Sequence, residues 1–349
     1  FWLKPFCLEP FGSRQRAVAR IGLALSMQQE TAPLLGSAAP VAEGEALPLH
    51  VRVNVENLTA IDTVSQTFQA KVFLEAIVPG GVKKPGLKAC LEERYFRAFG
   101  ILNAMTYEEK YRDIVESGDD LLMHWRVVCS FDETMELQAF PFDEQELNIS
   151  FTVNNSNEGS YPVKIVPLPE KSQVQVNGFK LGGTWQLAPA LVFEVKSSDP
   201  HVSGRARTYP IMVTKMYVRR HPAYYMWNVV LPMASFVLMG FTTRAVPNTS
   251  AADRLSLSLT LVLTAAAYKF VVASMLPAIS YMTLLDSYVT WCSAFLFFIV
   301  MENALMSLDV LSDFDETAFM VLAASLLLVN LYFGVKALRI MHATRKRYQ

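Results

Sequence analysis

The chain has 349 residues, of which 52% are hydrophobic and 18% are charged, and its formal net charge is −1. Soluble proteins average about a quarter charged residues, and the apolar residues here gather after residue 222. This distribution indicates a soluble half followed by a membrane half, and the near-neutral charge gives no indication of a nucleic-acid partner. The cysteines lack metal-ligand spacing, so we expect no metal site. A Cys90–Cys129 disulfide is possible if this part of the chain is an extracellular domain.

Residues 1–46 mix Ala, Pro, Gly and Gln without periodicity, which is typical of a leader or a poorly ordered extension. From 47 to 220 the chain has short alternating segments, and His50–Val55 is the clearest of them. This pattern predicts an all-β, immunoglobulin-like sandwich of about ten strands. Short helices are predicted at 92–103 and 108–115. The predicted strands are 50–55, 67–77, 121–131, 134–139, 147–153, 173–179, 184–187, 191–195 and 211–218.

The part from 221 to 349 contains apolar segments at 223–241, 255–276, 284–305 and 318–338, each long enough to span a membrane as a helix of about 20 residues. Pro232 lies inside the first, where neighbouring groups can satisfy the carbonyl that it frees. An even number of spans places both ends on one side. Counting Lys and Arg would place the sandwich inside the cell, but a long folded domain overrides that rule. We expect both termini outside a plasma or inner membrane.

The second apolar segment has hydroxylated and small residues along one stripe. Spacings of four and three place these residues on one helix face. A water-filled pore would use the hydroxyls, with the Leu and Phe as apolar constrictions. The alternative is a helix buried in a bundle, with its hydroxyls bonded to its own backbone. The predicted pore-lining residues are Ser256, Thr260, Leu263, Ala267, Phe270 and Ser274.

Four local patterns occur in order: IDTVSQTF at 61–68, FPFDEQ at 140–145, RRHPAYY at 219–225 followed by Asn228 and Pro232, and 253–277 with SYMTLLD at 280–286. Over residues 49 to about 342 the chain resembles the pentameric ligand-gated ion channels, or Cys-loop receptors. Glu133 and Leu147 stand where the signature cysteines would fall, so the loop resembles that of bacterial members. The resemblance implies a homopentamer around a central pore in a lipid bilayer.

The resemblance also implies roles for individual residues. Asp253 would form the selectivity ring, and Ala252-Asp253, rather than the Pro-Ala of anion-selective members, favours monovalent cations. Asp253 is also an ordinary helix N-cap by residue type, and Arg254 could neutralise it. Asp286 or Glu302 is the expected partner of Lys269. The implied gating and coupling residues are Phe140, Pro141, Phe142, Asp143, Arg220, Pro277 and Tyr281, with Asp143 paired to Arg220, and the implied ligand-binding residues are Phe96, Trp125, Phe193 and Tyr209.

The sequence therefore predicts a ligand-gated channel subunit in which an agonist bound between adjacent sandwiches opens the pore. The agonist is an unidentified small molecule or protons, because the aromatic agonist box is poorly kept. The alternatives are an anion-selective channel of the same family and a membrane-anchored receptor that does not conduct. We expect no cofactor and no enzymatic activity, since the histidines are scattered and no catalytic triad order is present.

Overall fold

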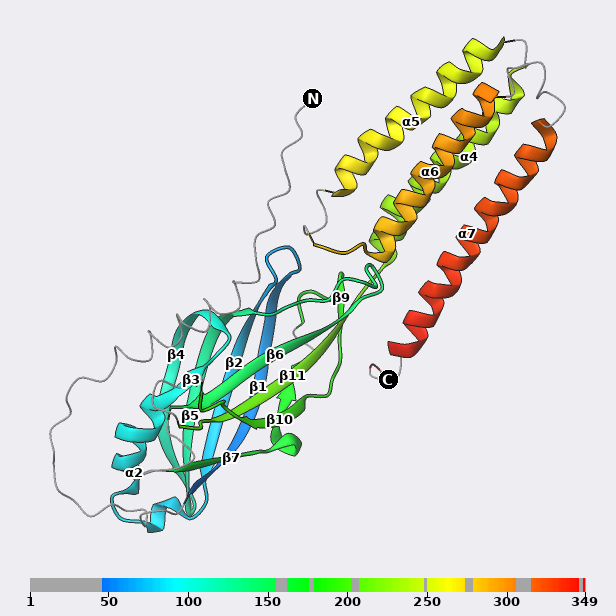
Figure 1. The fold of residues 1–349 in the computed structure, drawn as a ribbon. Coiled ribbons are helices and arrows are strands. Elements are labelled where there is room, and N and C mark those ends of the chain that lie inside the picture. The colour runs from blue at the N-terminus through cyan, green and yellow to red at the C-terminus, as the bar shows by residue number, and fades with distance from the viewer. Residues whose placement is uncertain are drawn as a thin grey trace.

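The computed structural model describes residues 46–154, 162–175, 179–201, 207–247, 250–273, 279–305, 315–344 and 348, so the predicted leader lies outside the described residues. Figure 1 shows a β-sandwich at one end of an elongated molecule and long helices at the other. The C-terminal end of the last helix lies at the base of the sandwich. There, the guanidinium of Arg219 lies 4.9 Å from the ring centroid of Tyr348.

The sandwich consists of two sheets. In the first, the strand order is β4-β5-β2-β1-β7, and β8 also pairs with β1; in the second it is β10-β11-β6-β3, and β9 also pairs with β11. The strands are β1 Leu47–Asp62, β2 Thr67–Val78, β3 Phe99–Ile101, β4 Ala104–Ser117, β5 Asp120–Asp132, β6 Glu144–Val153, β7 Val163–Pro167, β8 Gln173–Val174, β9 Trp185–Leu187, β10 Val192–Ser197 and β11 Pro210–Arg220.

Alternation of apolar residues builds the core between the sheets. In β1 the side chains of Leu49, Val51 and Val53 are completely buried, because successive residues of a strand face opposite sides of the sheet. Phe68 of β2 is paired with Phe131 of β5, and the two rings stack with centroids 4.6 Å apart. The predicted sandwich is confirmed.

Several predicted elements of the sandwich are wrong. Residues 108–115 belong to strand β4, which pairs with β5 along its length. The charged composition of β4, with three Glu and one residue each of Lys, Arg and Asp, suits an exposed edge strand as well as a helix. Residues 134–139 form a loop instead of a strand, and β8 covers only the start of the predicted 173–179 strand, part of which lies outside the described residues. The helical part of 92–103 ends at Ala98, where β3 follows.

Short helical segments cover one end of the sandwich: η1 Gly81–Lys83, α2 Leu87–Cys90, η2 Leu91–Tyr95 and η3 Phe96–Ala98. A further one, η4 Pro169–Lys171, lies beside β1 between β7 and β8. Leu87, Leu91 and Tyr95 recur every four residues and are completely buried. Cys90 and Cys129 are free thiols, so the disulfide is not present. Burial raises the pKa of the Cys129 thiol to about 12, which leaves it unreactive at neutral pH.

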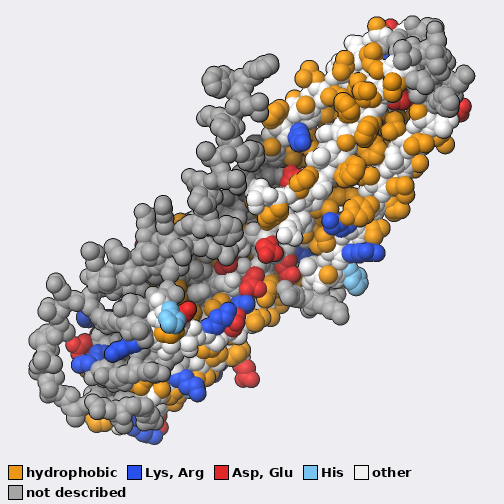
Figure 2. All heavy atoms as spheres, in the orientation of Figure 1, with side chains coloured by type: hydrophobic (Ala, Val, Ile, Leu, Met, Phe, Trp, Pro, Cys, Tyr) orange, Lys and Arg blue, Asp and Glu red, His pale blue; other side chains and the backbone are white. Residues whose placement is uncertain are grey.

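Within the described residues, four helical spans follow the sandwich. Their elements are α3 Ala223–Tyr225, η6 Met226–Val230, α4 Leu231–Thr242 and η7 Thr243–Ala245 in the first span, then α5 Ala251–Ala273, α6 Leu284–Leu305 and α7 Asp315–Thr344. All four are long and apolar enough to cross a membrane. Figure 2 shows hydrophobic side chains over the helices and most charged ones over the sandwich. The protein is therefore a multi-pass membrane protein.

Candidate pore and coupling interface

Helix α5 has two opposite faces. The side chains of Arg254, Ser258, Ala265 and Val272 are buried against the rest of the subunit. Ala265 is nine residues from Ser256, which at 3.6 residues per turn is about 2.5 turns. The predicted pore stripe therefore lies on the side of the helix directly opposite the buried side chains.

The described members of that stripe are all exposed in the single subunit. Leu263 and Phe270 have 71% and 79% of their surface exposed, and Ser256, Thr260 and Ala267 are exposed too. Thr260 donates its hydroxyl hydrogen to the carbonyl of Ser256 at 2.8 Å. The expected hydroxyl–backbone bond is thus present, but on an exposed face rather than a buried one. Ser274 and Pro277 lie outside the described residues.

Asp253 and Arg254 point in different directions at the start of α5. Asp253 is exposed and, being three residues before Ser256, lies about 60° from the centre of the stripe. Arg254 is only 3% exposed, and its Nε–H donates to the carbonyl of Thr243 at 3.4 Å. Arg254 is therefore held inside the bundle, away from the face on which Asp253 lies.

The loop between β5 and β6 supplies the acid of a buried ion pair, Asp143. Arg220, at the end of β11, donates from Nε to Asp143 Oδ1 at 2.9 Å and from Nη2 to Oδ2 at 3.3 Å. The Asp143 side chain is 1% exposed and that of Arg220 is 9%. Gln145 Nε2 donates to Asp143 Oδ2 at 2.7 Å. The expected Asp143–Arg220 pair is therefore present, with bidentate geometry that is favourable for such pairs.

Aromatic rings surround the guanidinium of this pair. It lies 4.1 Å from the ring centroid of Trp185 and 4.8 Å from that of Phe140. Phe140 in turn contacts Tyr225 of α3 edge-on, with centroids 4.6 Å apart. The rings stabilise the cation where water is excluded. The pair thus joins the last strand of the sandwich to the first span.

The same loop bonds directly to the beginning of α6. The N–H of Leu284 donates to the carbonyl of Gln138 at 3.1 Å, and the N–H of Leu285 donates to that of Phe140 at 3.2 Å. The N–H groups of a helix's first turn have no partner within the helix. Here two carbonyls of the loop accept hydrogen bonds from two of these groups. Tyr281 Oη accepts a hydrogen bond from the N–H of Leu137 at 2.9 Å.

The contacts of Phe142 differ from those expected. The resemblance also implies that Phe142 and Asp143 meet the linker at residues 276–283, of which the structure describes 279–283. Instead, Phe142 packs beside Phe333 of α7, with ring centroids 6.3 Å apart. Asp143 forms its ion pair with Arg220. Leu137 contacts the linker at Tyr281, and Gln138 and Phe140 contact the start of α6, all three through main-chain atoms that residue type does not reveal.

Asp286 caps helix α6. The N–H of Thr283 donates to Asp286 Oδ2 at 3.1 Å, and the N–H of Asp286 donates to Thr283 Oγ1 at 3.0 Å. This reciprocal arrangement is a capping box, and its Thr-x-x-Asp pattern is readable in the sequence. The other expected partner of Lys269, Glu302, lies 3.9 Å from Arg244. The structure gives no ion pair between Lys269 and either acid.

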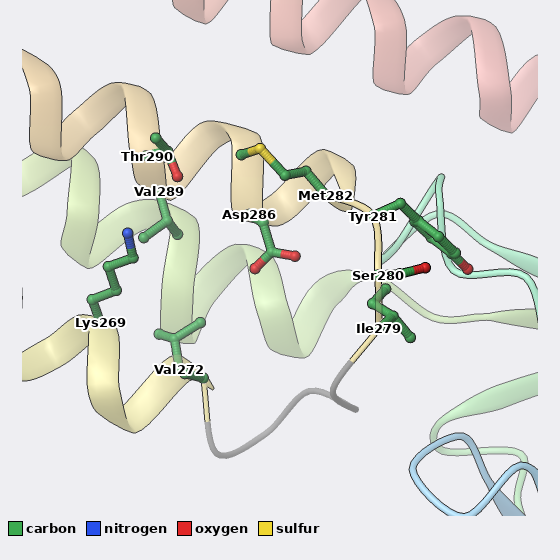
Figure 3. Close-up of a pocket in the computed structure, with 10 residues that line it drawn as sticks. Lys269, Val272, Ile279, Ser280, Tyr281, Met282, Asp286, Val289 and Thr290 are labelled. Atoms are coloured by element: carbon green, nitrogen blue, oxygen red, sulfur yellow. The ribbon is translucent and has the colours of Figure 1, made fainter. Parts of the chain in front are cut away.

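Lys269 and Asp286 nevertheless border one cavity of about 370 Å³. Figure 3 shows it between the end of α5, the linker before α6 and the first turns of α6. Val272, Tyr281 and Met282 supply apolar surface on its wall. A second pocket, of about 400 Å³, lies on the sandwich and is lined by polar side chains including Glu133, Asn148 and Lys215.

The expected ligand-binding aromatics fall into two groups. Phe96 and Trp125 are buried, and the guanidinium of Arg112 lies 5.1 Å and 5.2 Å from their ring centroids. Phe193 lies in β10, and Tyr209 lies just before β11, where its N–H donates to Ser198 Oγ at 2.8 Å. Arg112 therefore occupies the ring faces that an ammonium group would need.

Glu133, at a signature-cysteine position, is hydrogen-bonded to β6. Its carboxylate accepts from the N–H of Asn148 at 3.0 Å and from Asn148 Nδ2 at 3.1 Å. Burial raises the pKa of Glu133, and the two bonds oppose that rise. The bonds link the same two segments that a signature disulfide would join. Among the described residues, no cluster of His, Cys, Asp and Glu is placed to hold a metal ion.

Comparison with known proteins agrees with this geometry. No family model matches the chain. It is 27% identical over 179 residues to the 5-hydroxytryptamine receptor 3A of Cavia porcellus, covering 51% of this chain and 35% of that protein. It is 23% identical over 187 residues to the human gamma-aminobutyric acid receptor subunit gamma-3, covering 54% of this chain and 38% of that protein.

A third relative is the gamma-aminobutyric acid receptor subunit beta of Caenorhabditis elegans, which is 24% identical over 187 residues, 51% of this chain and 31% of that protein. The matched part thus spans about a third of the length of these relatives. These relatives are Cys-loop receptors, which are pentameric ligand-gated ion channels, and the chain is similar to them in sequence and in its β-sandwich followed by four apolar spans.

Proposed function

We propose that this chain is the subunit of a homopentameric ligand-gated channel that conducts monovalent cations. In this proposal the sandwich and both ends of the chain lie outside the cell, and an agonist binds between adjacent sandwiches. The pore is lined by the stripe from Ser256 to Phe270 and by Ser274.

The observation that carries the proposal is the division of α5 into two faces. A membrane helix that serves only as an anchor has no use for exposed hydroxyls, because lipid offers them no hydrogen-bond partner. Here the exposed stripe contains Ser256 and Thr260, and it lies opposite the side chains that pack inside the subunit. Placed around a central axis, these faces would line a hydrated passage, with Leu263 and Phe270 narrowing it.

Selectivity for cations is proposed for Asp253. Its exposed carboxylate near the stripe would form an acidic ring at one mouth of the pore, and the burial of Arg254 removes a neutralising charge. Asp253 lies in the first turn of α5, which begins at Ala251, so it is not the N-cap that its residue type suggested. A carboxylate in the first turn is favoured by the helix dipole and keeps the charge that the selectivity role needs.

For coupling, we propose that the loop of Phe140, Pro141, Phe142 and Asp143 carries movement of the sandwich to the helices. The buried Arg220 pair would transmit it to the first span. The bonds to Tyr281, Leu284 and Leu285 would transmit it to the linker after the pore helix, and Pro277 belongs to that linker. Because each contact is buried or uses main-chain atoms, displacement of the loop would displace both spans.

The agonist site is proposed near Phe193 and Tyr209, beside the hairpin of β10 and β11. Phe96 and Trp125 would act there only by supporting Arg112, since their ring faces are covered. This arrangement argues against an amine held by those two rings. A small molecule of another class, or protons, remains the proposed agonist.

Leu263→Ser tests the pore. It should wet the constriction, so we expect leak current in oocytes or planar bilayers, or greater agonist sensitivity in a ligand panel that includes a pH step. The matched control is Leu327→Ser on α7, since Leu327 also has 71% of its surface exposed. Silent membranes for Leu263→Ser, or equal leak in both variants, would favour a receptor that does not conduct.

A further inference from the structure

The first span contains a proline four residues after Asn228. In an α-helix, the N–H of each residue bonds to the carbonyl four residues before it. Pro232 has no N–H, so the carbonyl of Asn228 lacks its α-helical partner. The backbone is adjusted just before the proline, where η6 is a π-turn and the N–H of Leu231 donates to the carbonyl of Met226. Such π-turns are frequent at functional sites.

A side chain of the pore helix reaches this freed carbonyl. The hydroxyl of Tyr268, on α5, donates a hydrogen bond to the carbonyl of Asn228. Asn228 uses its side-chain amide elsewhere, since Nδ2 donates to the carbonyl of Tyr224 at 2.8 Å. The bond from Tyr268 therefore replaces, in chemistry and in position, the one that Pro232 cannot make.

The ring of Tyr268 is held on the same face of the first span. It meets Phe236 edge-on, with centroids 5.7 Å apart and an interplanar angle of 76°. Asn228, Pro232 and Phe236 are spaced by four and so share one helix face. Tyr268 thus contacts the first span on both sides of Pro232, by its hydroxyl at η6 and by its ring at α4.

We propose that Tyr268 is a positioning residue that holds the pore helix against the π-turn before Pro232 and thereby sets the gating equilibrium. This inference rests on the proposed function as a channel. A shift or rotation of α5 would pull the hydroxyl from the Asn228 carbonyl and leave a backbone group unsatisfied in an apolar region, which is unfavourable. The first span therefore favours one position of the pore helix, because the hydrogen bond that Pro232 cannot donate to the Asn228 carbonyl is supplied by Tyr268.

A double-mutant cycle with Pro232→Ala tests this. Alanine restores the N–H that can satisfy Asn228 within the helix, so the Tyr268 hydroxyl becomes redundant. In the leaking Leu263→Ser background, we expect Tyr268→Phe to change the current per surface channel by at least about fivefold, the factor for one lost hydrogen bond. With Pro232→Ala also present, the same change should have almost no effect. Tyr288→Phe is the control.

Tyr288 Oη donates to Asn330 Oδ1 at 3.0 Å, between α6 and α7, so its loss should not depend on Pro232. An equal effect of Tyr268→Phe with proline or alanine at 232 would overturn the inference. So would a fall in protein amount with unchanged current per channel. Pro232→Leu, which also restores the N–H, replaces Pro232→Ala if that variant fails to fold.

Failure of the proposed function is distinguishable. If Leu263→Ser conducts nothing, the channel proposal fails, while the same variants still report on the bond by thermal unfolding in detergent. Tyr268→Phe should then lower the melting temperature with Pro232 present and leave it unchanged with Ala or Leu at that position. Equal falls in all backgrounds would refute the bond itself.

Discussion

Removal of the Asp143 carboxylate should strongly destabilise the junction between the sandwich and the helices. The pair is buried, and loss of one partner of a buried pair costs about 3–5 kcal/mol, because the other charge stays desolvated. For a domain of this size each kcal/mol lowers the melting temperature by about 2–4 °C. Asp143→Ala should therefore lower it by roughly 6–20 °C, measured by circular dichroism in detergent.

Glu116→Ala is the matched control, since Glu116 pairs with Lys88 at 2.8 Å but both side chains are 51% exposed. Exposed pairs contribute about 0–1 kcal/mol, so a shift below about 4 °C is expected. Replacing both buried partners with Asp143→Ala and Arg220→Met should cost less than the sum of the single changes. Additive costs within about 0.5 kcal/mol would refute the reasoning.

Three further predictions concern charge and capping. Asp253→Ala should move the reversal potential toward zero under a NaCl gradient, whereas Glu316→Ala on α7 should not; an unmoved potential removes Asp253 from the filter. Burial raises the pKa of Glu133, so the folded state binds its proton more tightly and loses stability as the pH rises through that pKa. The melting temperature of Glu133→Gln should exceed that of wild type at pH near 8 and match it near pH 4; a pH-independent difference would contradict this. Thr283→Ala should cost about 1 kcal/mol through loss of the α6 cap, with recovery in Thr283→Ser, and an unchanged melting temperature would speak against the capping box.

The spans were readable because hydropathy alone determines them. The predicted span 284–305 coincides with α6, since a long apolar run has few other fates. The strand β4 was mistaken for a helix because its charged residues favour a helix in isolation, and pairing with β5 decides the matter. Local propensity gives way to tertiary pairing at such edges.

Residue type also explains which parts of the site were predictable. The Asp143–Arg220 pair was expected because the resemblance to the Cys-loop receptors implies that the arginine before the first span pairs with an acid. The partner of Lys269 was not predictable, because Asp286 caps helix α6 and forms no ion pair with Lys269. The contacts of Gln138 and Phe140 with α6 use main-chain carbonyls. Because every residue possesses a carbonyl, no pattern of side chains predicts these contacts.

The carbonyls of Gln138 and Phe140 have a practical consequence for genetics. Alanine scanning leaves main-chain atoms in place, so a scan across the loop and the start of α6 would register the rings and charges but pass over this junction. Replacing the amide of Leu284 or Leu285 with an ester, by nonsense suppression with a hydroxy acid, deletes the donor alone. Side-chain substitution therefore detects only part of the connection between the two halves of this molecule, and ester substitution of the backbone detects the rest.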